Sequence, residues 1–420
     1  MVDEQMPTQV KQRRVIYIPG YDPFHPRRYR ELYRKESAAQ AQISGYEISQ
    51  EAIKGQGPFA WKVHSRIDGQ ESEAQIDVLL WSDIVKNSMN PSIPATYAML
   101  VRTTWAYIGS GALFRLARLR KGPIIAALYP IVFLLAQLLL ALALGYGVAR
   151  LVGWGGPLLV LPIPLGVTTT LVQLLLGAGV AWGVLSWFRQ RDSKFFAYYL
   201  MHDYAYSARH RGANPPELEA RMAEFRSVIN EALRTDVDEV LVVGHSSGAH
   251  LGVSILADIM RQGWQRKDGP ALGFLTLGHV VPMVSFLPDA HRLRADLHDL
   301  CQWDQFTWVD VTAPGDGCAF ALCDPVAVTG VAPESGKRWP LVFSAAFSAT
   351  LSPERWKALK RRFFRLHFQY LCAFDRPRDY DYFQITAGPL TLADRYAKRG
   401  PSKSRIETPA SRYTSRKEAA

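Results

Sequence analysis

Residues 240–260 read VLVVGHSSGAHLGVSILADIM and predict a strand, a sharp turn and a helix in direct succession. The apolar run at 240–243 is typical of a buried strand, and residues 249–260 are typical of a helix. Between them lies the pattern Gly-x-Ser-x-Gly, with Ser246 at its centre. The pattern alone arises by chance on the order of once in ten such chains. Here the flanking strand and helix support it, because a strained strand-to-helix turn is what exposes a nucleophilic serine.

The rest of the chain alternates short apolar runs with helical patterns. Runs rich in β-branched and aromatic residues predict further strands at 15–18, 61–67, 76–81, 272–277, 306–311 and 341–343. Apolar residues recur at helical spacing between Leu218 and Leu233, after the prolines at 215 and 216. This alternation predicts an α/β fold with a mostly parallel sheet and helices on both faces.

A block of apolar sequence interrupts the alternation. Residues 124–149 carry no charge over 26 positions, which as a helix would extend about 39 Å against a hydrocarbon core of about 30 Å. Residues 165–188 add 24 uncharged positions after Pro162 and Pro164. A Gly/Pro-rich turn with Trp154 joins the two stretches, and Trp187 lies near the end of the second. The block therefore predicts a two-helix transmembrane hairpin.

The charges around the hairpin predict its orientation. Only Arg150 lies in the turn, whereas cations cluster at both outer ends, at Arg115, Arg118, Arg120, Lys121, Arg189, Arg191 and Lys194. By the positive-inside rule we expect a multi-pass protein of the inner (cytoplasmic) membrane, with the α/β domain on the cytoplasmic side. Two buried core helices or an apolar lid of a soluble protein, and a hairpin that dips into one leaflet, are the alternatives.

The composition divides the chain into four parts. A transmembrane hairpin insertion at 112–191 separates two parts of one α/β domain, at 1–111 and 192–393. From Asp394 the chain is rich in Ser, Lys and Arg and poor in large apolar residues, which predicts a basic disordered tail at 394–420.

The net charge of +11 is concentrated beside the apolar block and in the tail. Zinc-finger spacing and a basic helical face are both missing from the sequence, so we expect a lipid bilayer and no nucleic acid as a partner. The four cysteines form no CxxC pair and no metal-ligand spacing, which is typical of reduced thiols in a cytosolic compartment.

The strand, elbow and helix around Ser246 resemble those of the α/β-hydrolases, and more closely those of their lipase and esterase branch. The resemblance covers residues 240–260 and extends more weakly to Ile18-Pro19-Gly20 and to the predicted strands after the elbow. It implies Ser246 as the nucleophile, followed in the chain by an acid and then by a histidine. It also implies an oxyanion hole made by the amide of Ser247 and by an amide of the early loop, from Gly20 or Tyr21.

Chain order selects the general base. Only His367 follows the predicted strand at 306–311, and it lies in a segment at 361–370 that we expect to be an aromatic helix. The other histidines precede that strand: His25, His64, His202, His210, His245, His250, His279, His291 and His298. A core-facing histidine is the alternative interpretation of His367.

Two aspartates are candidates for the acid that orients this histidine and stabilises its cation. Asp316 follows the strand at 306–311, in a Gly-flanked turn that we expect to be exposed. Asp324 precedes Pro325-Val326 and resembles the Asp-x-Val element of some lipases. Asp310 is expected within the strand. We favour Asp316, with Asp324 as the rival, and either residue could instead be an ordinary turn aspartate.

These residues predict a membrane-anchored serine hydrolase that cleaves carboxylic esters. The hairpin favours lipid esters or acyl thioesters as substrates, because acyl chains would reach the site from a bilayer. We expect no cofactor and no metal, since the sequence has no HxxxH or HxH pair, no phosphate loop and no GxGxxG after a strand. An acyltransferase and a membrane-anchored scaffold without turnover are the alternatives.

Overall fold

The computed structural model describes residues 9–53, 57–88, 92–155 and 165–417. The chain forms two compact units. The first, which we call the sheet unit, comprises Met1–Asn87, Ala106–Ile124 and Ser207–Ala420. The second, the helical unit, comprises Ser88–Trp105 and Ile125–Tyr206. These limits differ from the predicted insertion at 112–191, because the helical unit also takes in residues on both sides of the apolar block.

The sheet unit contains one eight-stranded sheet in the order β2-β3-β4-β1-β5-β6-β7-β8. The strands from β4 onward in this order pair in parallel, and β2 and β3 pair antiparallel at one edge. This confirms the predicted α/β class with a mostly parallel sheet. The strands are β1 (Gln12–Ile18), β2 (Glu47–Ala52), β3 (Phe59–Ile67), β4 (Gln70–Val78), β5 (Glu239–His245), β6 (Ala271–Leu277), β7 (Phe306–Thr312) and β8 (Leu341–Ser344).

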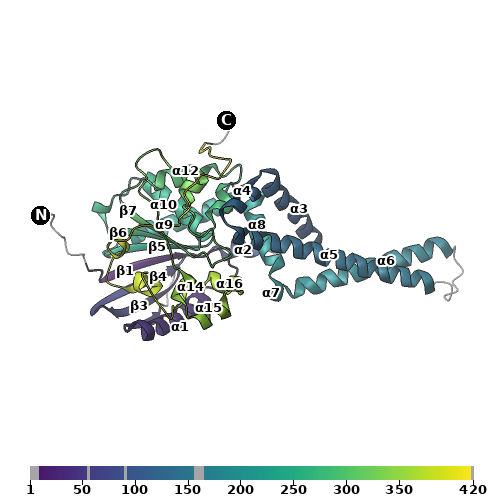
Figure 1. Ribbon diagram of the computed structural model, residues 1–420, viewed down its shortest axis with the longest axis horizontal. Helices are drawn as coiled ribbons and strands as arrows, with labels where there is room; N and C mark the ends of the chain where they lie inside the picture. The colour runs from purple at the N-terminus through teal and green to yellow at the C-terminus, as the bar shows by residue number, and fades with distance from the viewer. Residues whose placement is uncertain (1–8, 54–56, 89–91, 156–164, 418–420) are drawn as a thin grey trace. The chain divides into compact units, whose positions relative to one another are not determined.

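Helices cover both faces of this sheet (Figure 1). On one face lie α9 (Pro216–Ala232), α10 (Gly248–Arg261) and α12 (His291–Leu300). On the other lie α1 (Arg27–Ser44), α14 (Phe347–Thr350), α15 (Pro353–Leu359) and α16 (Phe363–His367). The remaining helices of the unit are α2 (Ser82–Ser88), α4 (Ala112–Leu119), α11 (Val281–Ser285), α13 (Pro325–Thr329), α17 (Tyr382–Ala387) and α18 (Leu392–Tyr396).

The insertion leaves the sheet continuous because β1 lies between the two strands that flank the inserted sequence. Ile16 is in register with Asp77 of β4 on one side and with Val242 of β5 on the other. The strand β2 was not predicted because its sequence, EISQEA, is polar. This strand lies largely exposed at the edge of the sheet. The predicted strand at 76–81 begins earlier and ends at Val78, and Trp81 is buried beyond it.

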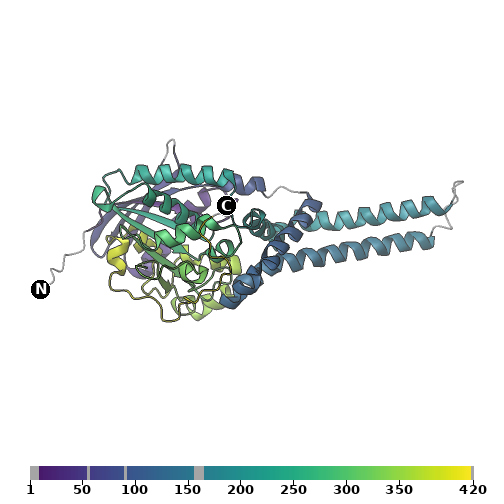
Figure 2. The same cartoon turned by 90° about the horizontal axis from the view of Figure 1, so that it is seen from above.

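The helical unit is built around two long apolar helices, α5 (Lys121–Gly155) and α6 (Leu165–Gln190). They run side by side in opposite directions (Figures 1 and 2), and Gly145 of α5 contacts the backbone of Gly177 of α6. Lys121–Trp154 and Thr170–Gln190 are long and apolar enough to cross a membrane. The shorter helices are α7 (Asp192–Phe195) and α8 (Ala197–Arg209), and α3 (Ile93–Gly109) runs from this unit into the sheet unit. The predicted turn at Pro162 and Pro164 lies outside the described residues.

The C-terminal segment differs from the predicted disordered tail at 394–420. It is described through Lys417 and is bonded to the sheet unit mainly through backbone groups. Ile406 pairs in parallel with Cys323, and the buried guanidinium of Arg294 donates to Ser415 O at 2.6 Å. Composition does not reveal this order, because backbone hydrogen bonds to distant loops require no large apolar side chains.

Candidate active site

Ser246 lies on a strained turn between β5 and α10. Its φ is +56°, a conformation that side-chain-bearing residues rarely adopt. Both glycines of the motif are required because neighbouring backbone atoms leave no room for a Cβ. A Cβ on Gly248 would collide with Ile18 O, and one on Gly244 would lie 2.8 Å from Ala249 Cα. The two glycines therefore allow α10 to start directly against the ends of β1 and β5.

The loop after β1 lies against this serine. A Cβ on Gly20 would lie 2.9 Å from Ser246 Cβ and 3.3 Å from its Oγ. Trp81 holds the loop by donating its indole N–H to Pro19 O at 2.9 Å, and the Tyr21 ring packs edge-on against the same indole. Among the described residues, the backbone N–H groups of Gly20 and Ser247 donate no hydrogen bond. Two amides beside the serine are thus available to an oxyanion.

His367 is paired with Asp316. The His367 Nδ1 lies 2.7 Å from Asp316 Oδ2, and both side chains are buried. Two further donors bind the carboxylate: the Tyr370 hydroxyl at 3.1 Å from Oδ2, and the backbone N–H of Cys318 at 2.9 Å from Oδ1. Burial raises the pKa of Tyr370 well above its usual value, so its hydroxyl stays protonated and donates.

Ser246 and the Asp316–His367 pair lie at the same end of the sheet, because Ser246 directly follows β5, Asp316 follows β7, and β5, β6 and β7 are parallel. Ser246 N donates to Leu277 O at the end of β6. The next residue, Gly278, is so close to the pair that a Cβ there would lie 3.1 Å from His367 Cε1 and 3.3 Å from Asp316 Oδ2. No hydrogen bond joins Ser246 to His367 within the described part of the chain.

The rival acid, Asp324, has other partners. It caps α13 by accepting from Val326 N at 3.0 Å and Ala327 N at 3.1 Å, and it forms an ion pair of 2.6 Å with Lys337. Its two oxygens are thus engaged in a cap and a salt bridge.

The expectation that Asp316 lies in an exposed turn is wrong, since it is only 2 % exposed. Aromatic rings cover the glycines on either side of it. A Cβ on Gly315 would lie 2.5 Å from the indole of Trp356, and one on Gly317 would lie 2.9 Å from Phe363. These rings come from a distant part of the chain, so the local sequence around Asp316 does not indicate its burial.

His245 supports the candidate base, a role that chain order did not suggest. Its Nε2 lies 3.0 Å from His367 O, and the two rings are 4.8 Å apart. Burial, with the nearby His367, lowers the pKa of His245 to about 3. Burial likewise lowers the pKa of His250 and of His279 to about 4, so all three imidazoles are neutral at pH 7.

The segment predicted as one helix at 361–370 is the short α16 followed by a 3-10 turn at Gln369–Leu371.

One group of the described residues has the composition of a metal site. Ligand atoms of Asp316, Cys318 and His367 all lie within 4.8 Å of one another. The 2.7 Å contact between His367 and Asp316 is a hydrogen-bond distance. A tetrahedral ion bound at about 2.0–2.2 Å would hold its ligand atoms more than about 3 Å apart. The arrangement therefore fits a hydrogen bond between the imidazole Nδ1–H and the carboxylate better than a metal site.

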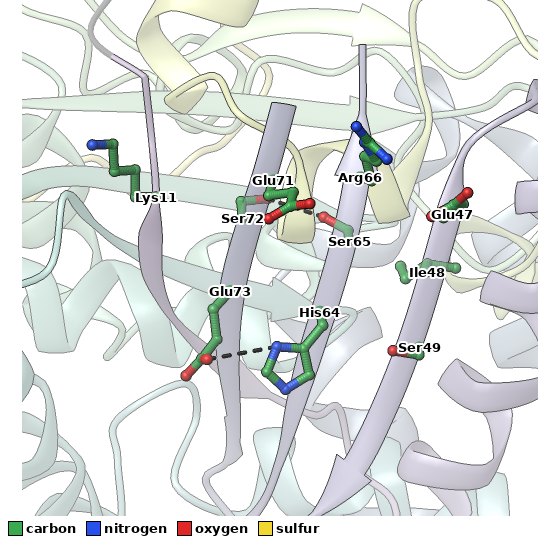
Figure 3. Close-up of a pocket in the computed structure, with 10 residues that line it drawn as sticks. All are labelled: Lys11, Glu47, Ile48, Ser49, His64, Ser65, Arg66, Glu71, Ser72 and Glu73. Carbon is green, nitrogen blue, oxygen red and sulfur yellow. Dashed lines mark hydrogen bonds and ion pairs between the residues drawn. The ribbon is translucent and has the colours of Figure 1, made fainter. Parts of the chain in front are cut away.

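A polar hollow of about 530 Å³ lies elsewhere on the sheet unit, over β2, β3 and β4 (Figure 3). His64 Nδ1 lies 3.6 Å from Glu73 Oε2 on the neighbouring strand, and Lys11 and Arg66 also line the hollow. Glu73 is in register with Gln12 at the start of β1, so the hollow lies at the opposite end of the strands from Ser246. Its charged, open walls do not match the site of an apolar ester.

Comparison of the chain with protein-family models, with curated proteins and with solved structures found no match.

Proposed function

We propose that this chain is a serine hydrolase of the α/β-hydrolase type that cleaves carboxylic esters. The observation that carries the proposal is the arrangement of residues at the carboxyl ends of the parallel strands. There a serine on a positive-φ elbow lies at the same end of the strands as a buried Asp316–His367 pair, and the neighbouring amides of Gly20 and Ser247 donate no hydrogen bond to the described residues. In this proposal Ser246 is the nucleophile, His367 the general base and Asp316 the orienting acid.

Each group has a defined task in the reaction. Asp316 accepts a hydrogen bond from the Nδ1–H of His367, which fixes the tautomer in which Nε2 is the base that takes the Ser246 hydroxyl proton. The serine oxygen bonds to the ester carbonyl carbon, and the carbonyl electron pair moves to its oxygen, where amides of Ser247 and of Gly20 or Tyr21 donate to it. Collapse expels the alkoxide, which takes the proton from His367. Water then repeats these steps on the acyl-enzyme and releases the acid.

The proposal predicts that a fluorophosphonate probe labels the full-length protein and that Ser246→Ala abolishes the labelling. The probe needs an activated serine, and removal of one hydroxyl from a turn leaves the fold intact, so the Tm should shift by no more than roughly 2 °C. Ser227→Ala is the matched control, because Ser227 is exposed on α9. Equal labelling of wild type and Ser246→Ala would refute the assignment of the nucleophile.

The hairpin is the second part of the proposal: α5 and α6 anchor the enzyme in the inner membrane, with the sheet unit in the cytoplasm. Only 33 % and 11 % of their most apolar stretches are buried, whereas core helices of a soluble protein would be mostly covered. The flanking cations give the orientation by the positive-inside rule.

This topology predicts the reactivity of single cysteines introduced into a variant whose four native cysteines are replaced by alanine. In intact cells, a membrane-impermeant thiol reagent should label Gly155→Cys, in the predicted outer turn, and should not label Ser193→Cys. Permeabilising the cells should expose Ser193→Cys, which is the control for its reactivity. Protection of both cysteines in intact cells would favour a hairpin within one leaflet or a soluble core.

A further inference from the structure

A dense cluster of cations precedes the candidate base. Residues 357–365 read KALKRRFFR, and we call them the basic aromatic segment. Its five cations are all exposed, and none forms an ion pair with a carboxylate within the described residues: Lys357, Lys360, Arg361, Arg362 and Arg365. Phe363, in their midst, exposes 52 % of its surface. Unpaired cations around an exposed aromatic ring are typical of a surface that binds an anionic partner and an apolar phase together.

This segment adjoins the candidate active site on two sides. It ends two residues before His367. Phe363 also packs on the loop of the acid, since a Cβ on Gly317 would lie 2.9 Å from its ring. Whatever binds the basic aromatic segment therefore lies beside both His367 and Asp316.

The first turn of α5 contacts the same loop, and these residues all belong to the sheet unit. A Cβ on Gly122 would lie 3.0 Å from Gly317 Cα, and Arg120 Nε donates to Ala321 O at 2.6 Å. From Lys121 onward the chain continues as the longer of the two apolar helices. A residue adjacent in the chain to a membrane-spanning stretch lies at the level of the lipid headgroups. The loop of Asp316, and the segment packed on it, are then at that level too.

We propose that the basic aromatic segment binds the anionic headgroups of the bilayer that α5 enters. It thereby holds the Ser246 site against that leaflet, so the substrates are acyl esters of lipids within the leaflet. Juxtamembrane clusters of this many cations are suited to anionic lipids, and Phe363 supplies an apolar contact below the headgroups. The headgroup contact is independent of catalysis, whereas the choice of lipid esters rests on the proposed hydrolase function.

The headgroup contact is tested on the full chain in lipid nanodiscs, with amide hydrogen exchange of residues 353–367 as the readout. Exchange should be slower in discs that contain phosphatidylglycerol than in discs of phosphatidylcholine alone. The triple variant Lys360→Gln, Arg361→Gln, Arg362→Gln should lose this difference. Wild type should also lose this difference in exchange at 1 M salt, because the screening length is then about 3 Å instead of about 8 Å at 0.15 M. The matched control is Arg234→Gln, Arg266→Gln, Lys267→Gln, three exposed cations near the opposite, amino ends of β5 and β6.

The substrate class is tested with two esters that share a leaving group, p-nitrophenyl palmitate in the discs and p-nitrophenyl acetate in water. Phosphatidylglycerol should raise the palmitate-to-acetate rate ratio about tenfold in wild type and in the control triple. The ratio should not rise in the segment triple. The inference would be overturned if phosphatidylglycerol changed neither the rate ratio nor the exchange. It would also be overturned if the control triple lost these two effects to the same extent as the segment triple. Lipid-dependent exchange without hydrolysis of either ester would instead remove the proposed function and the substrate class, while leaving the headgroup surface in place.

Discussion

Ser246→Ala, His367→Ala and the double variant should each hydrolyse p-nitrophenyl acetate about six orders of magnitude more slowly than wild type. Nucleophile and base act in one step, so removal of either member of a triad costs about as much as removal of both. What remains is the contribution of the oxyanion amides and of substrate binding, which these variants keep. The comparison of the three kcat values measures this non-additivity directly.

Two controls make the comparison decisive. Ser227→Ala should retain the wild-type kcat, because Ser227 is exposed on α9. The Tm of each variant shows whether the fold is intact, since His367 is also a buried side chain. If the losses of the single variants instead multiply in the double variant, His367 acts through packing and the triad assignment fails.

Asp316→Asn should lower kcat by about four orders of magnitude, whereas Asp324→Asn should lower it far less. An asparagine at 316 can donate to His367 Nδ1 and so favours the tautomer in which Nε2 is protonated and cannot act as the base. Asp324 instead binds Lys337 and the start of α13. Its replacement leaves Lys337 without its carboxylate and should cost about 1–3 kcal/mol of stability.

Measuring kcat and the urea midpoint of both variants separates these roles. The expected pattern is a large kinetic loss with a small change of midpoint at 316, and the reverse at 324. A large kinetic loss at 324 with little at 316 would reverse the assignment of the acid. If neither variant loses activity, the hydrogen bond between Asp316 and His367 is structural.

The placement of the hairpin explains how an apolar insertion coexists with an intact site. The inserted sequence leaves the sheet unit after β4 and returns before β5, and β1 pairs with both strands. Ser246 is therefore positioned by β1, β5 and β6. None of these three strands depends on the sequence inserted between β4 and β5. This separation predicts that the elbow geometry is independent of the apolar helices α5 and α6, in contrast to the loop of Asp316, which the first turn of α5 contacts.

Features that depend on local pattern could be predicted from the amino-acid sequence. Short runs rich in apolar, β-branched and aromatic residues predicted seven of the strands, and the strand and helix on either side of Ser246 predicted the elbow. The charge-free stretches predicted α5 and α6. Each of these signals lies in a few consecutive residues, because strand alternation, helical spacing and hydrophobic length are properties of short segments.

Features that depend on contacts between distant segments became visible in the folded chain. It pairs Asp316 rather than Asp324 with His367, and it brings Trp356 and Phe363 over the turn that looked exposed. It also orders the polar C-terminal segment through backbone bonds and adds β2 to the sheet edge. Burial and pairing of this kind join residues far apart in the chain, so no window of consecutive residues encodes them, and only the packed fold brings them together.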